Sequence, residues 1–120
     1  MYQHLVVAVD GSATSVNALQ HACSVAKAGN ARLTLVHVAN PAEYMALAPE
    51  FLQQESYEEA AVANGNEVLR AAAEQADAAG IADIQVHLLV ANKGAREMAQ
   101  ELVNYADQQG ADVLVLGTHG

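Results

Sequence analysis

The stretch that most constrains this chain is Leu5 to Ser12, where five apolar residues are followed by aspartate, glycine and serine. A short apolar run that is rich in valine and closed by a turn signal is typical of a strand buried on both faces. Such strands belong to parallel sheets covered by helices, and a helical pattern follows from about Thr14 to Ala28. In open α/β sheets, ligands bind beyond the carboxyl ends of the strands. The stretch therefore predicts a fold class and the place of a candidate site, at Asp10 to Ser12.

Strand and helix patterns alternate along the rest of the chain. Further strands are expected over 31–38, 84–90 and 113–116, and further helices up to about residue 79 and over 95–108. The connector over Ala42 to Tyr57 leads into the long helix. Asn64-Gly65-Asn66 is a turn signal that we expect this helix to tolerate, at about 1 kcal/mol. The alternation predicts a single α/β domain over residues 1–120, built on a doubly wound parallel sheet with right-handed crossovers.

Apolar residues three and four apart predict one buried face on each helix. For the first helix these positions are Val16, Leu19, Cys23 and Ala26. For the long helix they are Val62, Leu69, Ala73 and Ala76. For the last helix they are Met98, Ala99, Leu102, Val103 and Ala106.

The charge balance argues against a nucleic-acid partner. The net charge is -9, and the 14 acidic residues far outnumber the 5 basic ones. Nucleic-acid binding needs a basic stripe, and this field would repel a polyanion. No apolar run approaches membrane length, and the single cysteine excludes an internal disulfide. We therefore expect a soluble cytoplasmic protein with no membrane or nucleic-acid partner.

Two strands are expected to end in residues suited to a ligand. The first is followed by Asp10, and the last by Gly117-Thr118-His119-Gly120. If these strands are neighbours and the chain order reverses between them, they flank a switch-point crevice. Glycine-turn amides suit phosphate, and the Asp10 carboxylate suits a ribose hydroxyl or Mg²⁺. Each motif alone is weak, but together they predict a nucleotide site that is neither a P-loop nor a dinucleotide fingerprint.

Other chemically active residues carry weaker hypotheses. His4, His37 and His87 lie at different depths in their strands, so a shared metal site is not expected. Cys23 falls on a buried helix face and is expected to pack without reacting. Lys93 and Arg96 either attract an anion or are simply solvated.

Three segments together resemble the universal stress protein family. They are His4 to Ser12, Leu33 to Val38 and Ala111 to Gly120, and they occur in the family's order. The resemblance covers most of the chain, with Ala42 to Tyr57 unmatched. It implies a five-stranded parallel sheet of order 3-2-1-4-5, a homodimer and a role in stress survival.

The resemblance also implies site residues. In the ATP-binding branch of the family, the acid after the first strand meets the nucleotide, which implies Asp10 with Ala8 and Val9 beside it. The last residue of the second strand contacts adenine, which implies Val38. The ribose and phosphates lie on a glycine loop, whose first half is matched by the following residues: Leu116, Gly117, Thr118, His119 and Gly120.

The second half of that loop and the fifth strand do not follow within these 120 residues. We expect them in a longer tail, because Val113 to Leu116 would otherwise form an exposed apolar edge. The expected function is binding of ATP, with Mg²⁺, or of a related adenine nucleotide as a regulatory ligand. No base beside a nucleophile and no lysine for a transferring phosphate is recognised, so at most slow ATP hydrolysis is expected. The alternative is a nucleotide-free dimerising interaction module of the same fold.

Overall fold

The computed structural model describes residues 2–47, 54–91 and 94–117. Within these ranges, the elements in chain order are β1 (His4–Ala8), α1 (Ala13–Gly29), β2 (Arg32–Ala39), α2 (Pro41–Leu47), α3 (Gln54–Ala78), β3 (Ile84–Val90), α4 (Ala95–Gln108) and β4 (Val113–Leu116). Helix α2 lies in the connector whose structure the sequence pattern did not predict. The remaining elements match the expected alternation of strands and helices.

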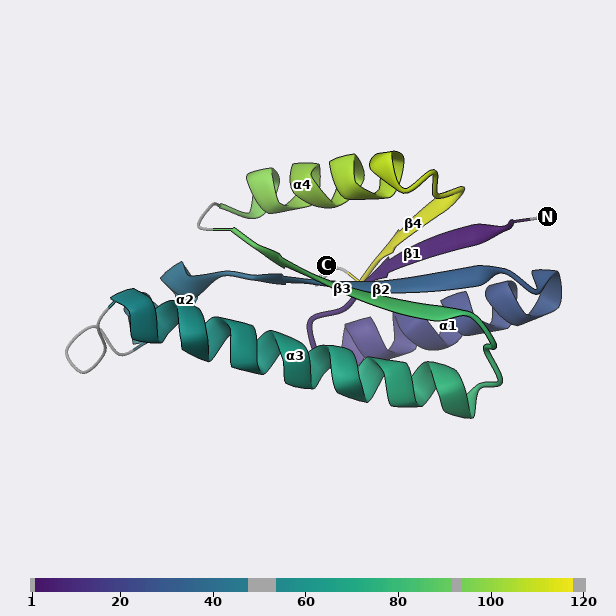
Figure 1. The fold of residues 1–120 in the computed structure, drawn as a ribbon, viewed down its shortest axis with the longest axis horizontal. Helices are drawn as coiled ribbons and strands as arrows, with labels where there is room; N and C mark the ends of the chain where they lie inside the picture. The colour runs from purple at the N-terminus through teal and green to yellow at the C-terminus, as the bar shows by residue number, and fades with distance from the viewer. Residues whose placement is uncertain (1, 48–53, 92–93, 118–120) are drawn as a thin grey trace.

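The four strands form one parallel sheet of order β3-β2-β1-β4. Helices α1 and α3 cover one face of the sheet and α4 covers the other, as Figure 1 shows. The predicted doubly wound α/β fold is therefore confirmed. The chain order reverses between β1 and β4, because β1 is followed in space by β2 on one side and by β4 on the other.

Both faces of the central strands are buried, as the apolar run predicted. Leu5 and Val7 pack toward α1 and α3, whereas Val6 packs toward α4 with Val36 and Leu102. Alternate side chains of a strand point to opposite faces, so each face receives its own share of the run. The outer strands are more open: Val86 of β3 is 53% exposed and Leu116 of β4 is 41% exposed.

The predicted buried face was wrong for Val16, which is 45% exposed. The buried stripe of α1 passes instead through Ser15, Leu19, Ala22, Cys23 and Ala26. One residue corresponds to about 100° around a helix, so Ser15 faces the sheet and Val16 lies beside the stripe.

The prediction was also wrong for Ala99, which is exposed, and for Val103, which is 48% exposed. Only Leu102 and Ala106 of the predicted set on α4 are buried, with Met98 half-buried. The stripe is therefore narrower than the apolar pattern suggested.

Local signals define the helix ends. Ser12 caps α1, with its hydroxyl accepting from Ser15 N–H at 3.1 Å. Asn30 ends the same helix in the left-handed conformation, at φ 52°. Helix α3 continues through Gly65 without a break, as expected.

Within the described residues, no helix is both long and apolar enough to cross a membrane.

Candidate functional site

The turn after β1 is held by a small set of hydrogen bonds. Asp10 N–H donates to Ser15 Oγ at 3.1 Å, and Ser12 N–H donates to Asp10 Oδ1 at 2.9 Å. Gly11 allows the turn, because it adopts φ +84°. The Asp10 carboxylate is thereby fixed at the exposed carboxyl end of the sheet.

The end of β4 lies directly beside this turn. Leu116 pairs with Ala8, and Gly117 follows it. A Cβ added to Gly117 would lie 3.0 Å from Ser15 Cα and 3.1 Å from Ser15 N, both backbone atoms. A side chain at this position would therefore press against the backbone at the start of α1. The two predicted segments meet as far as Gly117, and Thr118, His119 and Gly120 lie outside the described residues.

Strand β2 extends beyond the end of β1. Their ladder ends where Ala8 pairs with Val36 and Val9 N–H donates to Val36 O at 2.8 Å. In a parallel ladder, alternate residues bond to the same neighbouring strand. The N–H and C=O of Val38 therefore point to the β1 side, as those of Val36 do. In the described part of the chain, no residue is bonded to them there.

His37 is a site residue whose role sequence reasoning missed. Its Nδ1 donates to Val9 O at 2.7 Å, and the side chain is buried at 8% exposure. The signal that could have identified it is a polar residue within the apolar stretch from Leu35 to Ala39. A buried imidazole requires a partner, and the carbonyl at the end of β1 supplies one.

Two adjoining cavities open at the carboxyl ends of the strands. The cavity on the α4 side has a volume of about 470 Å³, and its lining includes the following predicted site residues: Ala8, Val9, Asp10, Val38, Leu116 and Gly117. The cavity on the α3 side, of about 540 Å³, is lined by Ala61 and Asn64 among others. Both are lined by Asp10, His37, Val38, Glu43 and Met98. We call this combined space the carboxyl-end crevice.

The crevice is acidic among the residues that the structure describes. Asp10 and Glu43 contribute carboxylates, and no described Lys or Arg lines either cavity. A polyphosphate would therefore need a counter-cation or backbone amides to balance its charge. In the same ranges, no group of three His, Cys, Asp or Glu side chains is placed to hold a metal ion alone.

The three strand histidines have separate surroundings. His4 Nε2 is 2.8 Å from Thr34 Oγ1 at the amino end of the sheet. The ring of His87 stacks on Tyr105, with centroids 4.6 Å apart. Cys23 of α1 faces the core, where burial raises the pKa of its thiol and disfavours the reactive thiolate.

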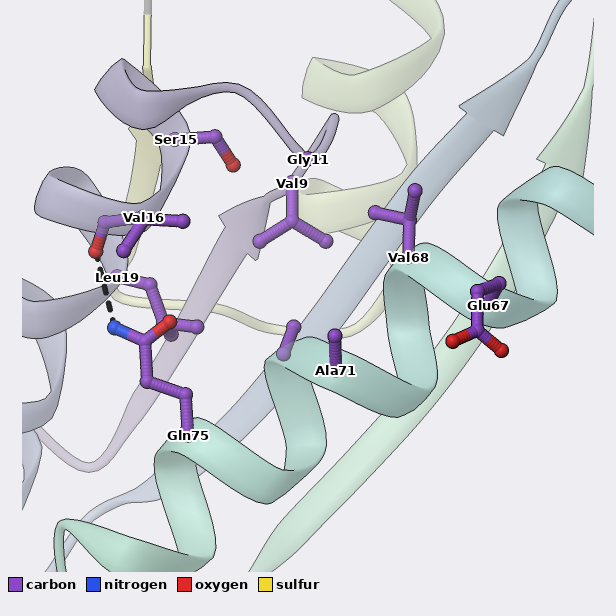
Figure 2. Close-up of a pocket in the computed structure, with 10 residues that line it drawn as sticks. Val9, Gly11, Ser15, Val16, Leu19, Glu67, Val68, Ala71 and Gln75 are labelled. Carbon is purple, nitrogen blue, oxygen red and sulfur yellow. Dashed lines mark hydrogen bonds between the residues drawn. The ribbon is translucent and has the colours of Figure 1, made fainter.

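A third cavity lies between α1 and α3 (Figure 2). Its volume is about 230 Å³, and its lining is mostly apolar, with Ser15, Glu67 and Gln75 as the polar members. Gln75 Nε2 donates to Val16 O at 3.0 Å across its side. This cavity shares Val9 and Gly11 with the lining of the crevice, whereas Asp10 and Val38 do not line it.

A family model described as "Universal stress protein family" matches residues 1–120. Universal stress protein Rv1636 of Mycobacterium tuberculosis is 36% identical over 119 residues, which cover 99% of this chain and 77% of that protein. Its crystal structure matches with a TM-score of 0.69 and 30% identity, covering 99% of this chain and 73% of that one.

Two further solved structures have the same fold. A crystal structure titled as a universal stress protein in complex with cAMP matches with a TM-score of 0.65 and 33% identity, over 94% of this chain and 70% of that one. A universal stress family protein from Burkholderia pseudomallei matches with a TM-score of 0.79 and 27% identity, over 98% of this chain and 83% of that one.

Proposed function

This chain belongs to the universal stress protein family, and on that premise we propose that its carboxyl-end crevice binds an adenine nucleotide as a regulatory ligand. The observation that carries the proposal is the backbone of Val38. Its N–H and C=O point into the space left by the end of β1, and Val38 lines both cavities. A similar protein at 33% identity has been crystallised with cAMP, an adenine nucleotide.

Adenine complements this backbone edge. The base presents the N1 acceptor next to the N6 amine, so a strand N–H and C=O pair can satisfy both. The side chains of Val38, Met98 and Leu102 supply apolar surface beside that edge. Pockets of this kind, mostly apolar with a few fixed polar groups, are typical of small-molecule sites.

The remaining predicted residues suit the ribose and phosphates. Asp10 is fixed at the lip of the crevice, where its carboxylate suits a ribose hydroxyl. Gly117 brings the end of β4 to the same lip. We assign Thr118, His119 and Gly120 to the phosphate side because they continue the same segment.

We further propose ATP with Mg²⁺ as the ligand. Carboxylate oxygens such as those of Asp10 suit Mg²⁺, which is usually bound by one or two carboxylates together with substrate phosphates. A divalent ion would also balance a triphosphate in the acidic crevice. Fast hydrolysis is not proposed, because no described lysine lines the crevice to hold a transferring phosphate.

The alternative, a nucleotide-free dimerising module, is favoured by one specific observation. Among the described strands, β4 lies at one edge of the sheet, and its apolar residues are only half-buried, with Leu116 41% exposed. An edge of this kind invites pairing with another chain. Homodimerisation in the cytoplasm is compatible with both proposals.

The test begins with the purified protein. When the protein is denatured, we expect it to release adenine nucleotide into the supernatant, where mass spectrometry would detect it. If the purified protein is empty, we expect it to bind ATP, AMP or cAMP in calorimetry, measured with and without Mg²⁺. Gly117→Ala should weaken binding by about tenfold or more, because the added methyl group meets backbone atoms of Ser15.

Gly94→Ala is the matched control. Its added Cβ would meet only the flexible Glu97 carboxylate at 3.1 Å, and Gly94 lines neither cavity of the crevice. We expect this variant to bind nucleotide normally. Wild-type protein that binds no adenine nucleotide, with or without Mg²⁺, would contradict the proposed function and favour the interaction module.

A further inference from the structure

We propose that His37 is a positioning residue that keeps the Val38 N–H available to the ligand. This inference rests on the proposed function, and it assigns His37 a role distinct from contact with the nucleotide.

The ladder would ordinarily continue by one more bond. Val9 N–H donates to Val36 O, so the next bond in a parallel ladder would join Val38 N–H to Val9 O. That bond is absent between these two described residues, and their register stops at Ala8 and Val36. Instead, Val9 O accepts from His37 Nδ1 at 2.7 Å. The imidazole therefore donates to the same carbonyl that Val38 N–H would bond in a continued ladder.

The chemistry of the carbonyl fixes the proton on the ring. A carbonyl oxygen can only accept, so the proton of this bond must reside on Nδ1 of His37. Val9 is 5% exposed and His37 is 8% exposed, so water competes poorly for the bond. A side chain from β2 thus ends the ladder by local competition with the backbone, as side-chain hydrogen bonds commonly do at the ends of regular elements.

Helix α3 fixes the other side of the ring. A Cβ added to Gly65 would lie 2.8 Å from His37 Cδ2 and 3.5 Å from His37 Nε2. The absence of a side chain at Gly65 is therefore what allows the ring to lie between the helix and Val9 O. This explains why the long helix contains Gly65, which the sequence pattern showed only as a turn signal.

For ligand binding, the consequence is that the Val38 N–H can donate to a ligand without first breaking a bond within the protein. If Val38 N–H were paired with Val9 O, a ligand would have to break that bond before using the donor. With His37 in place, the free protein already presents the edge that the nucleotide needs, which improves affinity by preorganisation.

The test pairs two substitutions with an exchange measurement. His37→Leu removes the donor, so Val38 N–H should move onto Val9 O. His37→Asn places an amide donor near the position of Nδ1 and should preserve the arrangement. His4→Leu is the control, because it removes a comparable ring contact, to Thr34 Oγ1 at 2.8 Å, at the opposite end of the sheet.

We expect the Val38 amide hydrogen of His37→Leu to exchange about tenfold more slowly than in wild-type protein, and nucleotide affinity to fall by about tenfold, the equivalent of one hydrogen bond. His37→Asn should stay within about threefold of wild type in both measurements. A merely structural role would speed exchange throughout the sheet and would not slow it at Val38. Unchanged affinity or faster Val38 exchange in His37→Leu would overturn the proposal.

Wild-type protein provides a test that does not depend on the variants folding. In the ligand-free state, the Val38 amide should exchange faster than the Val9 amide, which donates to Val36 O at 2.8 Å. Slow exchange at Val38 would overturn the role of His37 even if nucleotide binds. Conversely, fast Val38 exchange in a protein that binds no adenine nucleotide would uphold the open edge and contradict the proposed function.

Discussion

Replacing Gly65 with alanine should destabilise the protein, although the same change usually stabilises a helix. In a helix interior, glycine to alanine ordinarily gains about 0.5–1 kcal/mol. Here the added Cβ would lie 2.6 Å from Leu88 Cδ1 and 2.8 Å from His37 Cδ2. Both separations are too short for carbon atoms, which prefer about 3.5–4.0 Å.

The two neighbours differ in how easily they move. Leu88 meets the new methyl group with the end of a flexible side chain, so it can change rotamer. His37 cannot move without lengthening its 2.7 Å bond to Val9 O. Overpacking of this kind costs about 1–3 kcal/mol, and loss of the hydrogen bond adds about 1 kcal/mol. After subtracting the helix gain, we expect a net destabilisation of about 1–3.5 kcal/mol.

Thermal and urea unfolding followed by circular dichroism would measure the effect. For a domain of this size, a destabilisation of about 1–3.5 kcal/mol corresponds to a decrease in Tm of about 4–14 °C. Asn66→Ala is the control, because Asn66 is the next residue in the same helix and is exposed. That change should leave Tm unchanged or raise it slightly. A Gly65→Ala variant as stable as wild type, or more stable, would refute the reasoning about the His37 ring.

Two further predictions concern stability. Ser12→Ala removes the hydroxyl that accepts from Ser15 N–H at 3.1 Å, so the free energy of unfolding should fall by about 1 kcal/mol; no change in the urea midpoint would contradict this cap. Asp112 Oδ2 accepts from the N–H groups of Gln3 and His4, both at 2.8 Å, which holds the pKa of this carboxyl below its ordinary value. The carboxylate therefore stabilises the fold above about pH 4 and this contribution is lost as the pH falls through the lowered pKa. Asp112→Asn should flatten that acid-side decline in Tm, and an unaltered pH profile would show that the two bonds contribute nothing.

Much of the fold was predictable because the apolar run over Leu5 to Val9 has a single good structural solution. A strand that is apolar on both faces must be covered on both, and the helical patterns supply the cover. The meeting of Asp10 and Gly117 followed from the same logic, since both come directly after strands that are neighbours. These features depend on local pattern and on topology, which the sequence carries directly.

Other features depended on contacts between distant segments. Ser15 and Val16 point about 100° apart around the axis of α1, so which of them faces the sheet depends on how the helix is rotated against the strands. The apolar pattern favoured Val16, which was the wrong residue. The role of His37 depends on Val9 in another strand and on Gly65 in a helix. A histidine in an apolar strand and a glycine in a helix are each ambiguous, and only their contact explains them both.

The hydrophobic core is divided unequally between the two faces of the sheet. In the described ranges, fourteen buried residues form the cluster on the side of α1 and α3, whereas four form the cluster under α4. Local opening of a protein follows such differences, because a segment with little buried apolar surface detaches at a lower free energy than the rest. Helix α4 should therefore unfold locally while the other face stays intact. Met98 of α4 lines the carboxyl-end crevice, so a ligand bound there would also stabilise this helix against local opening. Occupancy of the crevice would then slow hydrogen exchange of the α4 amides.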